Sequence, residues 1–585
     1  MMTRVSIKKI KLSLSVALLA TLIGCASNQG YAPTGQPSNS PQTQQPSPSS
    51  EGQTEEIIVT ATRATSNSRS KYKRRRHSEK TAPQVSEHAY NDTDYNPHYS
   101  EEQLLILRKN SAQQIFKDYG VNPTISTAHE QHSTFAMDVD TVSYQLAKAG
   151  INSGRLPNKS SIRVEEFVNN FAYNYASNDD TLSISAEVVP SPYRPGFHLL
   201  HVGVKAKHVS EEQRLPANLV LVADVSGSMN SNDKMGLQKQ ALTTLVSQLD
   251  SRDSVAIVAY SDNAKVILRP TKASNKSKIY KAIRKMRIGG GTNVQQGLEQ
   301  GYAMAEKMAY PGHVNRVVLT SDGLANIGYV DPKQILKRVG DYKRRNIFLT
   351  TVGVGRNMYN DFLLEQLANQ GNGGYLYLAN QNDIERVFVD GLTTQLQVVA
   401  KDAKVQLSFN PERVSLFRQI GYENRGLQKQ DFLDAHKDGG EVGANQQVTV
   451  LYEIKLVNSN TNEDLANVAL SYKKPQGSKV FTVDKPIPSS VIRSNNETSS
   501  SDTVVSMAVA AFAEKLRQSY WSRTYGYRDI ELELKSLPRH VRNSEHIIEL
   551  RNLVEQASEL DSRHDPYAER YPLSRIDYDR VPLLR

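Results

Sequence analysis

The most constraining feature of this chain is a short apolar run that ends in oxygen-bearing side chains. Residues 219–223 read Leu-Val-Leu-Val-Ala, too few for a helix and too apolar for a half-exposed strand. We therefore predict a strand that is buried on both faces of a parallel sheet. Asp224, Ser226 and Ser228 follow it at alternate positions. Because alternate residues of a loop can direct their oxygens into one space, this turn is the first candidate site.

Two later loops offer further oxygen ligands. Thr292 follows three glycines at the start of a predicted helix, and Asp322 follows a second apolar strand predicted over 316–321. Ligands of open α/β sheets bind where loops meet at the carboxyl ends of neighbouring strands, so we expect the five side chains to converge. A simpler alternative is that Asp224 and Ser226 only cap the helix that follows them. Capping leaves the two later residues unexplained.

The chemistry of these donors predicts a divalent metal. Carboxylates and hydroxyls are hard oxygen donors, and this low-charge set suits an octahedral Mg2+ or Mn2+ that keeps some of its water. D-x-S-x-S, a distant Thr after glycines, and Asp-Gly after a strand also resemble the metal-ion-dependent adhesion site (MIDAS) of the von Willebrand factor type A (VWA) family. The resemblance implies that Ser226, Ser228 and Thr292 hold the cation directly. It also implies that Asp224 and Asp322 act largely through water, and that a partner's carboxylate fills the open position.

Segments on both sides of this site resemble a bacterial VWA lipoprotein family typified by YfbK. The resemblance begins with 133–144 and 162–171, and it continues into a C-terminal region at 420–425 and 440–444. It therefore extends over about 133–560, and we expect the chain to be a member of that family.

The pattern of strands and helices predicts an α/β fold with an added β unit. Strands alternate with helical segments over 215–398, which predicts a doubly wound, mostly parallel, Rossmann-like sheet, the VWA domain. Strands are also predicted over 182–214, before this domain, and over 399–490, after it, where no helices intervene. We therefore predict one β-sandwich built from both flanks, with the α/β domain inserted in it or flanked by it.

Helical regions are predicted on either side of these units. Residues 102–181 have helical spacing near their start and are interpreted as a helical region associated with the VWA domain. Residues 491–585 are predicted to contain further helices and a tail. One of these helices is expected to start at Thr503, with Asp502 as its cap, and to bury the face that carries Phe512.

Two other motifs could carry enzyme chemistry. Asp138 and Asp140 follow apolar residues, as in the nucleophile loop of haloacid-dehalogenase-type phosphatases, but no convincing acidic pair follows later in the chain. His129 and His132 are one residue short of the H-E-x-x-H spacing that binds zinc on a helix, and we interpret them as exposed loop residues. No evident general base or nucleophile accompanies the predicted metal ligands. We therefore expect a binding protein and not an enzyme.

The start of the chain predicts export and anchoring. A basic start precedes an apolar stretch, 12–22, that is too short to span a membrane, as in a signal peptide over 1–24. The next residue, Cys25, is the single cysteine, and the sequence before it resembles the bacterial lipobox. The resemblance implies that Cys25 carries acyl chains such as palmitate, and Ala26 after it favours the outer membrane, on the periplasmic face or exposed. A lone cysteine excludes intrachain disulfides and multi-cysteine zinc sites.

Residues 25–101 are rich in Ser, Gln, Pro, Thr and Asn and predict a disordered tether. Within it, segment 55–63, which begins at Glu55 and ends at Arg63, resembles the part of TonB-dependent receptors that adds a strand to an energy-coupling partner. A basic cluster at 71–76 could touch anionic lipid or peptidoglycan, but a solvated charge run of the linker is the favoured interpretation. The net charge of +10 is spread along the chain and partly lies in the leader, so we predict no nucleic-acid binding.

These inferences combine into one functional hypothesis. The chain is expected to be an outer-membrane lipoprotein whose VWA domain binds a divalent cation and uses it for metal-dependent binding of another envelope protein, one that offers an acidic residue. The alternatives are an envelope scaffold with a dispensable metal, a TonB-linked accessory protein that acts through 55–63, and, less favoured, a metal-dependent hydrolase.

Overall fold

The computed structural model describes residues 116–573 with internal gaps. The residues left out within this range are 117, 138–139, 177–179, 211, 323–334, 336, 338–344, 356–360, 392–393, 395, 438, 459–461, 476 and 495–497. The predicted signal peptide, the predicted tether with its segment 55–63, Cys25 and Asp138 lie outside the described residues. All described residues belong to one unit, 95–585. No helix within the described ranges is long and apolar enough to cross a membrane.

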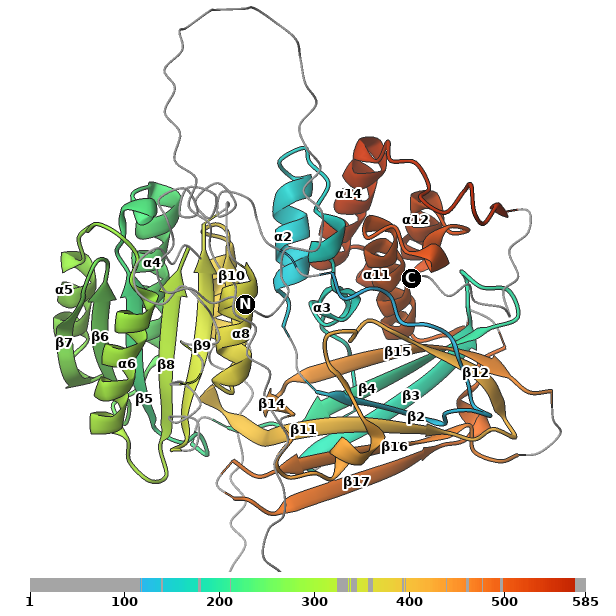
Figure 1. Cartoon of the computed structure of the whole chain (residues 1–585), viewed down its shortest axis with the longest axis horizontal. Coiled ribbons are helices and arrows are strands. Elements are labelled where there is room, and N and C mark those ends of the chain that lie inside the picture. Colours follow the sequence, from blue (N-terminus) through green and yellow to red (C-terminus); the bar gives the residue numbers. More distant parts are fainter. Residues whose placement is uncertain are drawn as a thin grey trace, which may run out of the picture. The chain divides into compact units, whose positions relative to one another are not determined.

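The α/β domain is built on one six-stranded sheet in the order β10-β9-β8-β5-β6-β7 (Figure 1). Neighbouring strands pair in parallel, except that β7 runs antiparallel to β6 at one edge. The strands are β5 (Ala217–Asp224), β6 (Ser254–Tyr260), β7 (Ala264–Lys272), β8 (Val314–Ser321), β9 (Ile347–Val354) and β10 (Tyr375–Leu378). The predicted doubly wound α/β fold is confirmed.

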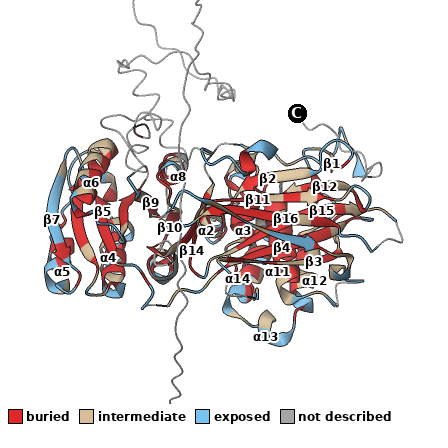
Figure 2. Ribbon diagram, turned by 90° about the horizontal axis from the view of Figure 1, so that it is seen from below, coloured by how far each residue is buried: buried red, intermediate tan, exposed pale blue. Residues whose placement is uncertain are grey.

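Helices cover both faces of this sheet, and the alternation of side chains along β5 explains why. Leu219 and Leu221 pack in a core with α4 and α5, whereas Val220 and Val222 point to the other face and pack with α6 and α8. Every residue of β5 is therefore buried (Figure 2). The helices are α4 (Leu237–Gln248), α5 (Lys276–Lys285), α6 (Val294–Met308), α8 (Asp361–Gln370) and α9 (Asp383–Glu385), with η4 (Arg386–Gly391).

Two further sheets pack face to face as a β-sandwich around one apolar core. Their orders are β1-β12-β15-β4-β3 and β13-β2-β11-β16-β17, with β14 beside β11. The strands that precede the α/β domain are β1 (Ile125–Ser126), β2 (His132–Ala136), β3 (Leu182–Pro190) and β4 (His198–Ala206). Those that follow it are β11 (Val398–Phe409), β12 (Val414–Ile420), β13 (Gly426–Leu427), β14 (Gly440–Gly443), β15 (Gln447–Leu456), β16 (Ala466–Lys473) and β17 (Val480–Ile487). Since β4 pairs with β15 and β2 with β11, the predicted sandwich from both flanks is confirmed.

The region 102–181 differs from its prediction as a helical region. It contains β1 and β2 in addition to helices. β2 reads His-Ser-Thr-Phe-Ala, with only one large apolar residue, and its pairing partner lies far along the chain, with Thr134 opposite Gln406. Neither local periodicity nor a neighbouring turn could therefore indicate this strand.

Helices from both ends of the described chain share one core against the five-stranded sheet (Figure 1). They are α2 (Val142–Ile151), α3 (Val164–Val168), α11 (Ser501–Leu516), α12 (Tyr527–Ser536), α13 (Arg539–Arg542) and α14 (Glu545–Leu560). The predicted cap of α11 at Asp502 is wrong, because the Ser500 hydroxyl accepts the hydrogen bond from Thr503 N at 3.2 Å. Asp502 lies in the first turn and accepts a hydrogen bond from Asn174 N.

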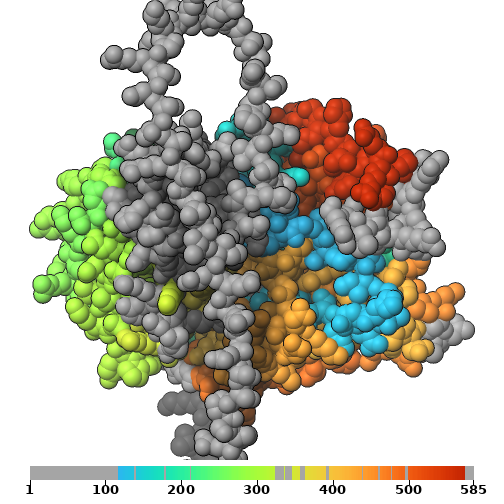
Figure 3. Space-filling view, viewed as in Figure 1, coloured from blue at the N-terminus to red at the C-terminus, as the bar shows by residue number. Residues whose placement is uncertain are grey.

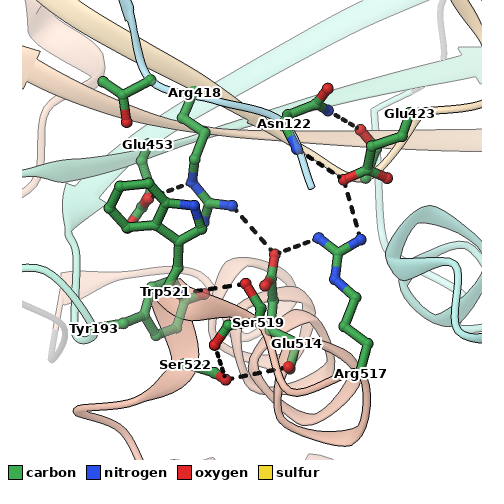
Figure 4. Close-up of polar contacts among 12 residues, drawn as sticks. Asn122, Tyr193, Arg418, Glu423, Glu453, Glu514, Arg517, Ser519, Trp521 and Ser522 are labelled. Carbon is green, nitrogen blue, oxygen red and sulfur yellow. Dashed lines mark hydrogen bonds and ion pairs between the residues drawn. The ribbon is translucent and has the colours of Figure 1, made fainter. Parts of the chain in front are cut away.

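A buried network of charged side chains joins α11 to the sandwich (Figure 4). Arg418 on β12 lies 2.8 Å from Glu453 on β15 and 3.3 Å from Glu514 on α11. Arg517 lies 2.8 Å from Glu514 and 3.1 Å from Glu423. Burial alone would raise the pKa of Glu514, but the two arginines lower it to about 2. The charges are therefore paired inside the core, which fixes how the helix lies on the sheet.

Candidate metal centre

The ends of two neighbouring parallel strands place the first carboxylate of the site. β5 and β8 lie side by side, so Asp224 at the end of β5 meets Ser321 at the end of β8. The Ser321 and Tyr260 hydroxyls donate to Asp224 Oδ2 at 2.9 and 3.2 Å, and Ser226 N donates to Asp224 Oδ1 at 2.8 Å. Three donors thus hold a fully buried carboxylate in one orientation.

The two serines of the motif face one another across the turn after β5. Ser226 precedes the short helix η2 (Gly227–Met229), in which Ser228 lies. Their Oγ atoms are 3.0 Å apart. Adjacent oxygen ligands of an octahedral Mg2+ each lie about 2.0–2.1 Å from the metal and at right angles to one another. Two such oxygens are then separated by nearly the distance found here, so both hydroxyls can contact a single ion.

The glycine loop that precedes Thr292 is hydrogen bonded to the same turn. Gly289 N donates to Val225 O at 2.6 Å, and Gly227 N donates to Gly290 O at 2.7 Å. A Cβ atom on Gly290 would lie 2.1 Å from Asp262 Oδ2, so a larger residue there would displace the Asp262 side chain from the glycine loop. Thr292 follows in this loop and is 1 % exposed.

A lysine that the motif did not reveal bridges two parts of the site. Lys234 Nζ donates to Asp322 Oδ2 at 3.0 Å and to the carbonyl oxygen of Ser228 at 3.1 Å. Lys234 lies on η3 (Asn232–Gly236), the π-helical turn that leads into α4. It thus connects the end of β8 to the serine turn, so all five predicted residues lie on segments that contact one another.

The electrostatics of the site fit a divalent cation. Asp224 and Asp322 are both fully buried, and burial, with the charge of Asp322 added to it, raises the pKa of Asp224 to about 6. Among the residues that the structure describes, Asp322 Oδ1 has no hydrogen-bond partner. A buried oxygen without a partner is costly, and a cation that several oxygens share removes that cost. The residues that would hold the ion are Asp224, Ser226, Ser228, Thr292 and Asp322.

The structure gives other roles to the alternative catalytic residues that it describes. Asp140 is 2.9 Å from Arg425 and accepts a hydrogen bond from Tyr375 N at 3.0 Å, so it connects β10 to the sandwich. His132 begins β2, its side chain is 19% exposed, and it pairs with Glu130 at 3.1 Å. The interpretation as an exposed loop residue is therefore wrong for His132, whereas His129 is exposed in a turn. In the part of the chain that the structure describes, no group of three or more His, Cys, Asp or Glu side chains could hold a metal. The predicted metal centre is of a different kind, because three of its five ligands are hydroxyls.

Comparison with known proteins assigns families to three segments of the chain. Residues 218–389 match the von Willebrand factor type A domain, 394–560 match the family described as uncharacterized protein YfbK, C-terminal, and 110–201 match a family described as von Willebrand factor. No enzymatic family is among these matches.

Two relatives and one solved structure extend this comparison. Uncharacterized protein YfbK of Escherichia coli (strain K12) is 32% identical over 443 residues, which cover 71% of this chain and 76% of that protein. Uncharacterized protein sll0103 of Synechocystis is 26% identical over 333 residues, 56% of this chain and 77% of that protein. A von Willebrand factor type A structure from Catenulispora acidiphila has a TM-score of 0.38 and 16% identity, and the match covers 58% of this chain and 80% of that chain.

Proposed function

This chain belongs to the YfbK family of bacterial VWA-domain proteins, and on that premise we propose that it binds a divalent cation and uses it to recruit a partner protein. One observation carries the proposal. Two serine hydroxyls lie 3.0 Å apart beside loops that bear two buried carboxylates, and one oxygen of Asp322 has no hydrogen-bond partner within the described part of the chain. The ion is Mg2+ or Mn2+, which hard oxygen donors favour.

The protein residues supply only part of an octahedral shell. Ser226, Ser228 and Thr292 hold the ion directly, as in the site that the motif resembles, and Asp224 and Asp322 hold it through water. The position left over takes a carboxylate of the partner, since a bound cation is the largest local charge and gives such a group a strong, directed contact. Affinity for the partner then depends on the metal.

The proposal also includes where in the cell this interaction takes place. The leader that ends before Cys25 resembles that of an envelope lipoprotein, so we propose that lipid on this cysteine anchors the chain in the outer membrane. The partner is accordingly another envelope protein that offers an acidic residue. An acylated anchor with more than one chain holds a protein firmly to the membrane.

Affinity capture from isolated envelopes, with Mg2+ or with EDTA, tests both parts of this proposal. We expect the chain itself to fractionate with the outer membrane. We also expect at least one envelope protein to be captured with Mg2+ and lost with EDTA. A chain found in the soluble fraction would contradict the anchor, and a capture profile that chelation does not change would contradict the metal-dependent recruitment.

A further inference from the structure

One segment at the edge of the α/β domain carries positive charge alone. Between Asp262 and Glu299 the chain contains no Asp or Glu but six Lys and three Arg. These residues lie on β7, on α5 and beside them, and we call this surface the basic face. Its members are Lys265, Arg269, Lys272, Lys276, Lys278, Lys281, Arg284, Lys285 and Arg287.

The charges of the basic face are exposed and are not compensated by the protein. All of its members except Lys276 are exposed, and Figure 2 shows the exposed surface along β7 and α5. Within the described ranges none of the nine forms an ion pair, and the side-chain hydrogen bonds of Lys272, Lys276 and Arg287 end on backbone carbonyls. Surfaces usually mix both signs, and a field of one sign steers oppositely charged partners.

The basic face runs directly into the candidate metal centre. At one end, the hairpin between β6 and β7 contacts the glycine loop, because Gly291 N donates to Asp262 Oδ1 at 2.7 Å. At the other, α5 ends at Lys285 and the chain continues through Arg287 into Gly289. Gly289 N is hydrogen bonded to Val225 in the turn after β5. Figure 1 shows β7 and α5 at the same edge of the sheet, and Figure 3 shows the surface of this domain in green.

We propose that the basic face is the docking surface for an acidic polypeptide segment of the partner, one carboxylate of which reaches the metal. The proposal rests on the proposed function and names the chemistry of its partner. Neighbouring Asp and Glu residues of such a segment meet the lysines and arginines of β7 and α5. The metal and the basic face then bind the same acidic segment. The metal fixes the orientation of one carboxylate, and the basic face raises the rate of association and the affinity.

Other polyanions fit this surface less well. α5 buries its apolar residues Ile279 and Ile283 toward the sheet, so it offers no apolar face for insertion into a membrane. Single-stranded nucleic acids are held by aromatic side chains that stack on bases, and Tyr280 is the only aromatic residue between 263 and 298. Val266 and Ile267, each 36% exposed on β7, add apolar contacts that suit a polypeptide.

Binding of a fluorescent glutamate-rich peptide to the purified chain tests the proposal. We expect the peptide to bind in Mg2+, with an affinity that falls as salt rises. The triple variant Lys278→Glu, Lys281→Glu, Arg284→Glu should weaken binding by about tenfold or more. A control triple variant, Arg155→Glu, Lys159→Glu, Lys429→Glu, makes the same change in net charge at exposed positions outside the basic face, and it should stay within about twofold of the wild type.

Measurements of Mg2+ binding and of peptide binding distinguish the role of the basic face from the proposed metal-dependent function. Isothermal titration with Mg2+ should give the same affinity for the α5 variant and the wild type, since none of the three positions is a metal ligand. Equal peptide binding by the α5 variant and the wild type would overturn the proposal, even where Mg2+ binding is normal. Tighter binding to phosphatidylglycerol vesicles than to the peptide would also overturn it and assign the face to a lipid surface. Absence of Mg2+ binding by the wild type would instead overturn the proposed function.

Discussion

Replacing Asp224 by Ala is expected to weaken Mg2+ binding by about 100-fold, the upper range for removal of a group that orients metal ligands. This carboxylate accepts the Ser226 backbone N–H and the Ser321 hydroxyl. Its loss therefore removes negative charge from the site and also releases the serine turn. Isothermal titration of the purified chain measures the effect directly.

The control for this prediction is Asp233→Ala, which removes an exposed carboxylate nine positions later in the same segment. It should leave the Mg2+ affinity unchanged within about twofold, because screening weakens the effect of an exposed charge. Circular dichroism of both variants checks that the sheet is intact. An Asp224→Ala chain that is folded and binds Mg2+ as tightly as the wild type does would contradict the assignment.

Replacing Glu514 by Gln is expected to lower the free energy of unfolding by about 3–5 kcal/mol at pH 7, the usual cost of leaving a buried charge without its partner. The variant keeps the shape of the side chain but removes the negative charge between Arg418 and Arg517. The exposed Glu555→Gln on α14 is the control, and it should change stability by less than about 0.5 kcal/mol. Urea denaturation of the three chains gives the comparison.

The same network predicts a pH dependence of definite sign. In the folded chain the two arginines lower the pKa of Glu514 from its usual value of 4.5 to about 2, although burial would raise it. The stabilisation by its charge is therefore fully present above pH 4.5 and is lost as the pH falls toward 2. The stability difference between the wild type and Glu514→Gln should shrink over this range. A difference that is constant between pH 7 and pH 3 would show that the ion pairs do not provide it.

Local patterns in the sequence were sufficient for most of the fold. The run 219–223 is apolar at every position, and the structure buries it on both faces because helices pack on each side. The change after 398 from alternating strands and helices to strands alone also marked the second half of the sandwich. The strand β2 was not predicted, because its five residues show no clear periodicity and only its pairing with β11 makes it a strand.

The candidate site was predictable to the extent that its residues belong to one motif. Asp224, Ser226 and Ser228 are spaced closely enough to be recognised, but Lys234 looks like any lysine at the start of a helix. Its contact with Asp322 depends on how β8 lies beside β5. Tyr260 could not be assigned to the site either. It is the last residue of its strand, and nothing in the sequence of that strand indicates that its hydroxyl contacts Asp224.

The buried charges were beyond sequence reasoning for a similar physical reason. Arg418, Glu453 and Glu514 lie on β12, β15 and α11, and their pairing exists only once these elements pack. The displaced cap of α11 is a smaller case. Ser500 and Asp502 both belong to residue types that cap helices, and the backbone at Ser500, extended at φ −65° and ψ 149°, decides between them.

The most direct test of the account is the anomalous scattering of Mn2+ in a crystal of the chain. We predict one strong peak at about 2 Å from the hydroxyl oxygens of Ser226 and Ser228, with Thr292 as a further direct ligand and a position open to solvent or to a carboxylate. No peak at saturating Mn2+, or a peak that these hydroxyls do not contact, would contradict the account.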